Sequence, residues 1–226
     1  MTRLKRLLLA ILGGVVAGAT IARLDVQIDT GFAAVFDHAV ITRWPWIGAA
    51  FGWVIFSFYW EIAAKNAAPA MSAESRSSRA IHLLLTNVGI VLLMVPLRGL
   101  SRFLPLSSAL MAGGLAVEAM GLSLAILARR HLGRNWSGEI SIKVDHQLIR
   151  SGPYKKMRHP IYTGILMMYA GTALVTGTWL ALAGFAMAAF AYARKIRLEE
   201  ANLNVAFGPE YAAYRRETWA LVPGLF

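Results

Sequence analysis

The chain has 226 residues, of which 57% are hydrophobic and 15% are charged, and its formal net charge at pH 7 is +11. This composition is too apolar for an ordinary soluble domain and favours a protein that spans a membrane. The absence of Cys excludes disulfides, thiol nucleophiles and thiolate metal sites.

The first part of the chain contains four apolar segments, at residues 4–22, 44–64, 80–97 and 106–128. Each is close to the roughly 20 helical residues that cross the hydrocarbon core of a bilayer. Segment 4–22 also resembles a cleaved signal peptide, because basic residues precede its apolar core and Ala17-Gly18-Ala19 is typical of a cleavage site. Cleavage would leave the later spans unchanged.

A fifth apolar run covers residues 159–193 and is too long for one crossing but barely long enough for two. We therefore expect a tight helical hairpin that turns within residues 171–178, "GTALVTGT". With this hairpin, the predicted fold class is an all-α, polytopic membrane bundle of about six spans. Further helices are expected on the cytoplasmic side at the carboxy terminus.

The distribution of cations predicts the orientation of the spans. Alternating the spans places 19 of the 23 Lys and Arg residues on one side of the membrane. Because cytoplasmic loops are enriched in Lys and Arg, both termini and the basic loop 129–158 are expected in the cytoplasm. Anionic membrane lipids then account for the positive charge without a nucleic-acid partner.

The polar stretch "GPYKKMRHPIYTG" (152–164) directly precedes the hairpin. Pro160 disfavours a helical conformation for His159 and is well tolerated at the first position of a helix, so His159 is expected to cap the next helix. The unbonded amides of that first turn, together with Arg158, would form a positive site for a carboxylate or phosphate. The alternative is that these residues are ordinary interfacial anchors.

The tail that follows the hairpin predicts a second half of the same site. A helix is expected to continue through Glu199 and Glu200, to end at Gly208, and to be followed by another that opens at Pro209. A carboxylate pair facing a cationic helix start could hold a ligand that bears both an ammonium and a carboxylate. The alternative is a solvated helix whose local ion pairs are each worth about 0.2–0.5 kcal/mol.

Four pieces of the sequence together resemble a known family. They are "LGRNWSG" (132–138), "HQLIRSGPYKKMRHPIYTG" (146–164), "EEANLNVAFGPEYAAYRRET" (199–218) and the terminal "LVPG". In this order and spacing they are similar to the isoprenylcysteine carboxyl methyltransferase and phospholipid methyltransferase superfamily of integral membrane enzymes. The resemblance implies that residues 1–128 select the substrate and that residues 129–226 bind the cofactor and carry out catalysis.

The resemblance also implies S-adenosylmethionine as the methyl donor. It places His146, Gln147 and Leu148 near the adenosine. The other donor-binding residues that it implies are Tyr154, His159, Pro160, Tyr162, Glu199 and Glu200, and the positive charge of Arg158 adds it to the donor-binding candidates. No Gly-x-Gly occurs in the chain, which argues against a Rossmann-type site, and no metal is expected.

The acceptor is expected to be a small lipophilic molecule or a lipid. A carboxylate acceptor would have to be oriented by a cation, for which Arg194 and Arg197 are the candidates. An amine acceptor would have to lose a proton, with help from Glu199, Glu200 or His159. Inside the spans, Glu118 is expected either to line a substrate cavity or to pair with another helix, and His82 to bond between helices. The sequence predicts no particular oligomeric state.

Two other functions are compatible with parts of this pattern. Membrane sterol and steroid reductases also carry an Arg-His-Pro element but use a reduced nicotinamide cofactor. They typically have an acidic residue after the glycine of the motif, whereas Ile165 follows Gly164 here. Methyl transfer is therefore preferred to reduction, and a membrane scaffold that has kept the pocket is the non-enzymatic alternative.

Overall fold

The computed structural model describes residues 43–95, 97, 99–105, 107–143 and 147–224. Helices dominate this part of the chain: α3 Trp44–Ala64, α4 Arg76–Met94, α5 Ser108–Leu132, α6 Pro160–Thr176, α7 Trp179–Phe207 and α8 Pro209–Glu217. Two short strands, β1 Ala70–Ala73 and β2 Ser141–Lys143, pair in antiparallel fashion. The all-α prediction is confirmed, and this small ribbon is an addition that the sequence did not predict.

Three of the helices, α3, α4 and α5, are long and apolar enough to cross a membrane. They correspond to the predicted segments 44–64, 80–97 and 106–128, with ends that differ by a few residues. The predicted segment 4–22 lies outside the described residues. The described part of the chain is therefore a bundle of membrane helices, whereas the cytoplasmic placement of the termini stays a prediction.

The predicted hairpin is formed by α6 and α7, which are apolar helices of 17 and 29 residues. Its turn is shorter than expected, because residues 171–176 continue α6. Gly177 ends α6 with a left-handed φ of 66°, a conformation that costs glycine little. The side chain of Thr178 then accepts a hydrogen bond from the backbone N–H of Ala181 and caps α7.

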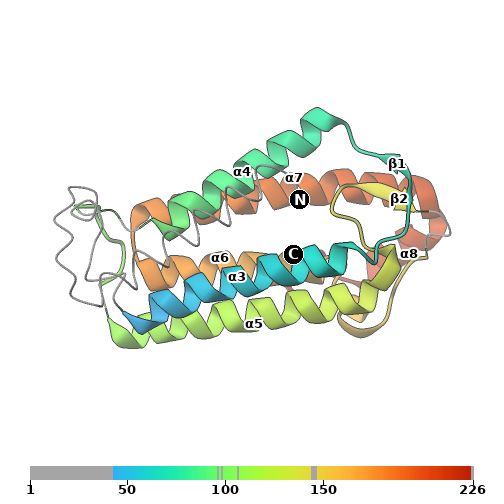
Figure 1. The fold of residues 1–226 in the computed structure, drawn as a ribbon. Helices are drawn as coiled ribbons and strands as arrows, with labels where there is room; N and C mark the ends of the chain where they lie inside the picture. The colour runs from blue at the N-terminus through green and yellow to red at the C-terminus, as the bar shows by residue number, and fades with distance from the viewer. Residues whose placement is uncertain (1–42, 96, 98, 106, 144–146, 225–226) are drawn as a thin grey trace.

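The helices are arranged in two layers (Figure 1). Helices α4 and α7 lie side by side in one layer, while α3, α5 and α6 form the other. The β1–β2 ribbon and α8 gather at one end of the bundle. This end is where the loop before α6 and the extension of α7 meet.

Glycines allow α5 and α6 to pack backbone against backbone. A Cβ atom on Gly121 would lie 2.5 Å from the carbonyl oxygen of Gly164, and one on Gly114 would lie 2.6 Å from that of Gly171. In a bilayer, where burial of apolar surface contributes little to helix association, such close packing between small residues is a main source of stability. We call these four residues the glycine seam.

Polar side chains add bonds between helices inside the bundle. Glu118, which is 1% exposed, lies 2.8 Å from the hydroxyl of Thr172 on α6, and the indole N–H of Trp53 donates to the same hydroxyl. Glu118 thus has a bond to another helix, and its role in lining a substrate cavity stays a prediction. The buried His82 lies 3.4 Å from the carbonyl oxygen of Ala191 on α7, as expected for a bond between helices.

Candidate functional site

A pocket opens at the end of the bundle that carries α8. Its empty volume is about 850 Å³, which includes open solvent at its mouth. Its walls come from the loop that follows α5, the start of α6, the extension of α7, and α8. The lining residues are Leu132, Asn135, Trp136, Ser137, Glu139, Ile140, Ser141, Gln147, Leu148, Ile149, Tyr154, Arg158, His159, Ile161, Tyr162, Glu199, Asn202, Leu203, Tyr211 and Tyr214.

The start of α6 is held in place by the segment that follows α8. His159 is the N-cap of α6 and Pro160 its first residue, as expected from the sequence. The backbone N–H groups of Arg158 and His159 donate to the carbonyl oxygens of Trp219 and Ala220, at 2.8 and 3.0 Å. The two backbone N–H groups just before α6 are therefore already hydrogen-bonded within the protein.

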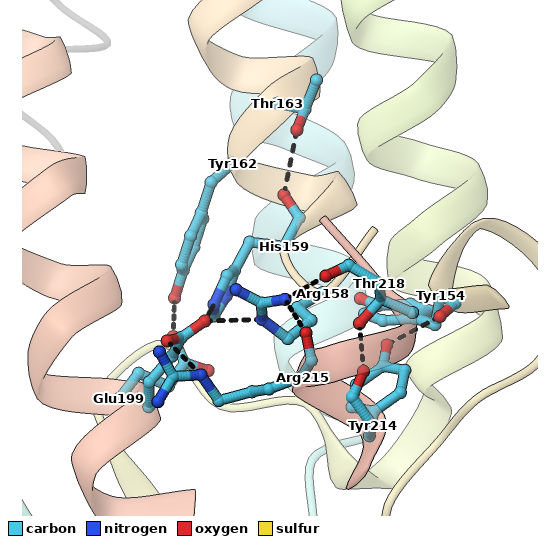
Figure 2. Close-up of polar contacts among 10 residues, drawn as sticks. Tyr154, Arg158, His159, Tyr162, Thr163, Glu199, Tyr214, Arg215 and Thr218 are labelled. Carbon is cyan, nitrogen blue, oxygen red and sulfur yellow. Dashed lines mark hydrogen bonds and ion pairs between the residues drawn. The ribbon is translucent and has the colours of Figure 1, made fainter. Parts of the chain in front are cut away.

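Glu200 lies at the centre of a cluster of charged side chains. Its carboxylate is 2.7 Å from Arg158 Nε, 3.2 Å from His159 Nε2 and 3.3 Å from Arg215 Nε. Figure 2 labels these three partners. Arg158 also donates to the carbonyl oxygens of Arg215 and Thr218. Glu200 is not among the lining residues, so in this structure it joins the start of α6 to α8 rather than facing the pocket.

The cluster makes the stability of the protein dependent on pH. Burial alone would raise the pKa of Glu200, but the hydrogen bonds and charges of His159 and Arg158 outweigh burial and lower it from 4.5 to about 2. A lowered pKa stabilises the folded state above pH 4.5, and this contribution is lost as the pH falls towards 2. A shift of this size corresponds to about 3 kcal/mol.

Replacing Glu200 by Gln should therefore lower the free energy of unfolding by up to about 3 kcal/mol at pH 7. The difference from the wild type should shrink as the pH is lowered from 4.5 towards 2. Unfolding of both proteins in detergent across this pH range measures the effect. An equal difference at every pH would show that Glu200 does not act through its charge.

The neighbouring Glu199 has different surroundings. It lines the pocket and accepts a hydrogen bond of 2.5 Å from the hydroxyl of Tyr162, whose ring stacks on that of His159 (Figure 2). Among the described residues, no Lys or Arg nitrogen lies within the 4.0 Å of an ion pair with Glu199. The pocket therefore contains a carboxylate whose charge is not balanced by a direct ion pair in the described part of the chain.

Most of the other predicted donor-binding residues also lie around the pocket. Gln147, Leu148 and Tyr154 line it, together with Arg158, His159 and Tyr162. Pro160 is buried but is not a lining residue. His146 lies outside the described residues.

The two predicted acceptor-orienting cations, Arg194 and Arg197, do not line the pocket. The guanidinium of Arg194 donates to the hydroxyl of Ser78 at 2.9 Å and so joins α7 to α4. Arg197 is exposed. The structure therefore brings neither arginine together with the predicted donor-binding residues.

Sequence reasoning missed a buried cation beside the pocket. Lys195 is 7% exposed, donates to the carbonyl oxygen of Gly138 at 3.1 Å, and has its ammonium 5.8 Å from the ring centre of Tyr162. Lys195 lies four residues before Glu199, which places both side chains on one side of α7. This spacing is the feature of the sequence from which its place beside the pocket could have been predicted.

Sequence reasoning also missed how one wall of the pocket is supported. The guanidinium of the buried Arg129 lies 4.4 Å from the ring centre of Trp136, a lining residue. Arg129 also donates to the carbonyl oxygens of Ala63 and Gly133, near the ends of α3 and α5. A cation is favourable at such helix ends, so one side chain both caps two helices and supports Trp136.

Comparisons with known proteins match the part of the chain that builds this site. Residues 114–205 match the model of the isoprenylcysteine carboxyl methyltransferase (ICMT) family. A protein-S-isoprenylcysteine O-methyltransferase of Dictyostelium discoideum is 32% identical over 36% of this chain and 35% of its own length. The cobalt-zinc-cadmium resistance protein CzcN of Cupriavidus metallidurans is 37% identical over 49% of this chain and 50% of its own length.

A probable protein-S-isoprenylcysteine O-methyltransferase of Oryza sativa is 31% identical over 49% of this chain and 59% of its own length. The chain thus matches between 35% and 59% of the length of these curated relatives. The matched region includes most of α5, all of α6 and most of α7, which contribute His159, Tyr162 and Glu199 to the pocket. Through this region, the chain is similar to the ICMT family of membrane methyltransferases.

Proposed function

We propose that this chain is an integral membrane methyltransferase that uses S-adenosylmethionine as donor and methylates the carboxylate of a lipophilic acceptor. The observation that carries the proposal is the carboxylate of Glu199, which faces the pocket without an ion-pair partner among the described residues. The family match and the O-methyltransferase names of the relatives support it.

The residues around the pocket fit the proposed donor. S-adenosylmethionine carries an ammonium and a sulfonium, and Glu199 offers the negative charge that such a cation needs. Aromatic side chains such as Trp136, Tyr154 and Tyr162 also line the pocket. Their ring faces can stack on an adenine and attract a cation, so the charge and the aromatic lining suit the same ligand.

When bound, S-adenosylmethionine supplies a methyl group on a positively charged sulfur. An acceptor carboxylate would form the new oxygen–carbon bond as the carbon–sulfur bond breaks, leaving S-adenosylhomocysteine and a methyl ester. No proton moves in this reaction, so no general base is needed. The contribution of the chain is to align the reacting atoms and to keep water away from them.

Lys195 is our candidate for the cation that orients the acceptor. Its ammonium has three N–H groups, and among the described residues it has one hydrogen-bond acceptor, the carbonyl oxygen of Gly138. It is buried and lies above the Tyr162 ring, whose hydroxyl bonds to Glu199. Lys195 is not itself a lining residue, but its ammonium lies beside the ring of Tyr162, which is, whereas Arg194 is bonded to Ser78.

Replacing Lys195 by Met should lower kcat/KM for an anionic acceptor by about 30-fold or more, because removing one partner of a buried charge pair costs at least about 2 kcal/mol. The dissociation constant for S-adenosylmethionine should stay within about twofold, a change below about 0.4 kcal/mol. Arg197→Met, at an exposed position of the same helix, is the matched control and should leave both values unchanged. An unchanged kcat/KM in Lys195→Met would place the orienting cation elsewhere.

The reaction itself can be tested with isotopically labelled S-adenosylmethionine. Membranes that contain the protein should transfer the labelled methyl group to a lipid, detected as a methyl ester by mass spectrometry. Labelled methylamines would instead indicate an amine acceptor. Transfer of labelled hydride from a reduced nicotinamide cofactor, without methyl transfer, would replace the proposal by a reductase.

A further inference from the structure

The hydroxyl of Tyr211 is the most unusual polar group in the wall of the pocket. Tyr211 lies on α8, lines the pocket and is 1% exposed. Among the described residues, its hydroxyl oxygen is buried without any hydrogen-bond partner. Buried polar groups in folded proteins are nearly always bonded, because leaving one unsatisfied is destabilising. Such a group in a pocket wall indicates a bond that forms when a ligand is present.

Tyr214 shows that a tyrosine hydroxyl on α8 can find a hydrogen-bond partner within the protein. It lies three residues further along the same helix, is also buried, and lines the same pocket. Its hydroxyl donates to the carbonyl oxygen of Tyr154 at 2.6 Å (Figure 2). Among the described residues, the protein therefore provides a hydrogen-bond partner for the hydroxyl of Tyr214 but not for that of Tyr211.

The surroundings of Tyr211 indicate which atom of the donor it would meet. Glu199 is placed to hold the ammonium of the amino-acid portion, and the carboxylate of that portion is attached to the same carbon atom. Arg158 also lines the pocket, but its Nε is bonded to Glu200 and its Nη1 to backbone carbonyls, so only its Nη2 has no bond within the described part of the chain. A carboxylate has two oxygens that accept several hydrogen bonds, so a second donor from the pocket wall can bind it beside Arg158.

Tyr211 can provide this second donor. Burial and the nearby charge of Glu200 raise the pKa of Tyr211 above its ordinary value, so its hydroxyl remains a proton donor at neutral pH. A hydrogen bond from a neutral donor to a carboxylate is among the stronger ones in proteins.

We propose that the hydroxyl of Tyr211 donates a hydrogen bond to the carboxylate of the bound donor, and so selects for methyl donors that carry this group. This inference rests on the proposed function. It assigns to α8 a direct contact with the donor in addition to its contacts with Arg158 and Glu200.

The test compares the affinities of two ligands for two proteins in a thermodynamic cycle. Binding of S-adenosylmethionine and of its decarboxylated form, which lacks only the carboxylate, is measured by isothermal titration for the wild type and for Tyr211→Phe. The substitution should weaken binding of S-adenosylmethionine about tenfold or more, as expected for a hydrogen bond to a charged group. It should leave binding of the decarboxylated form unchanged, because the bond is absent there in both proteins.

Unfolding of the ligand-free proteins gives a second, independent readout. Tyr211→Phe should keep or raise the melting temperature, because it removes a buried hydroxyl that has no partner. Tyr214→Phe, the matched control, should lower the melting temperature, because it removes the bond to Tyr154.

Three results would overturn the inference. Equal weakening of both ligands by Tyr211→Phe would place the contact on the nucleoside, and unchanged binding of S-adenosylmethionine would exclude a contact. A lower melting temperature of ligand-free Tyr211→Phe would show that the hydroxyl already has a partner in the protein. If the wild type bound neither ligand, the proposed function would fail first and this inference with it.

Discussion

Replacing Glu199 by Gln is expected to weaken binding of S-adenosylmethionine by about 30-fold or more, with little effect on folding. The substitution keeps the size of the side chain and a hydrogen-bond acceptor for Tyr162 but removes the charge. A charge pair that is lost from a partly buried site costs about 2 kcal/mol or more. Isothermal titration of the purified variant measures the loss.

Glu200→Gln is the matched control for this prediction, because it removes the same charge one residue further along α7. Glu200 is bonded to Arg158, His159 and Arg215 and does not line the pocket. Its substitution should therefore appear mainly as a lower free energy of unfolding. If Glu200→Gln reduced donor affinity more than Glu199→Gln at equal stability, the roles of the two carboxylates would have to be exchanged.

Replacing Gly114 by Ala is expected to lower the free energy of unfolding by about 1–3 kcal/mol, the usual cost of forcing an extra carbon into a packed core. The added Cβ would lie 2.6 Å from the carbonyl oxygen of Gly171 and 3.0 Å from the backbone nitrogen of Val175. These are backbone atoms, so α5 and α6 would have to separate. Reversible unfolding in mixed detergent micelles measures the change.

Gly113→Ala provides the control at the adjacent position of α5. Gly113 is exposed, and a Cβ atom added there would have no neighbour within 4 Å. Since Ala favours a helix more than Gly does, this variant should be as stable as the wild type or slightly more stable. Equal destabilisation by both substitutions would mean that helix packing at the glycine seam is not what stabilises the bundle.

The sequence predicted the spans well because each span must satisfy a length and a hydropathy that the bilayer imposes. The segments 44–64, 80–97 and 106–128 correspond to α3, α4 and α5 for this reason. The hairpin was predicted from length in the same way. Its turn was placed too early because Gly171 is a seam residue inside α6, whereas Gly177 is the residue that leaves the helix.

The β1–β2 ribbon was not predicted, because strands of four and three residues are too short to show a repeating pattern. Their pairing joins two segments that are far apart in the chain, Ala70–Ala73 and Ser141–Lys143. Such a contact depends on the whole bundle bringing the two segments together.

The position of the candidate site could be predicted, but not the direction in which each of its side chains points. Adjacent residues of a helix point about 100° apart. Whether Glu199 or Glu200 faces the pocket therefore depends on the rotation of α7. That rotation is set by packing against α4, where the backbones come close at Gly89 and Gly184. For the same reason, the sequence could not distinguish the buried Lys195 from its neighbouring arginines.

The measurement that tests the central claim most directly is titration of the purified, full-length protein with S-adenosylmethionine and, separately, with a reduced nicotinamide cofactor. The claim is that the pocket between the start of α6, the end of α7 and α8 holds the methyl donor. It predicts saturable binding of S-adenosylmethionine at one site per chain and no binding of the nicotinamide cofactor. Binding of the nicotinamide cofactor alone, or of neither compound, would contradict it.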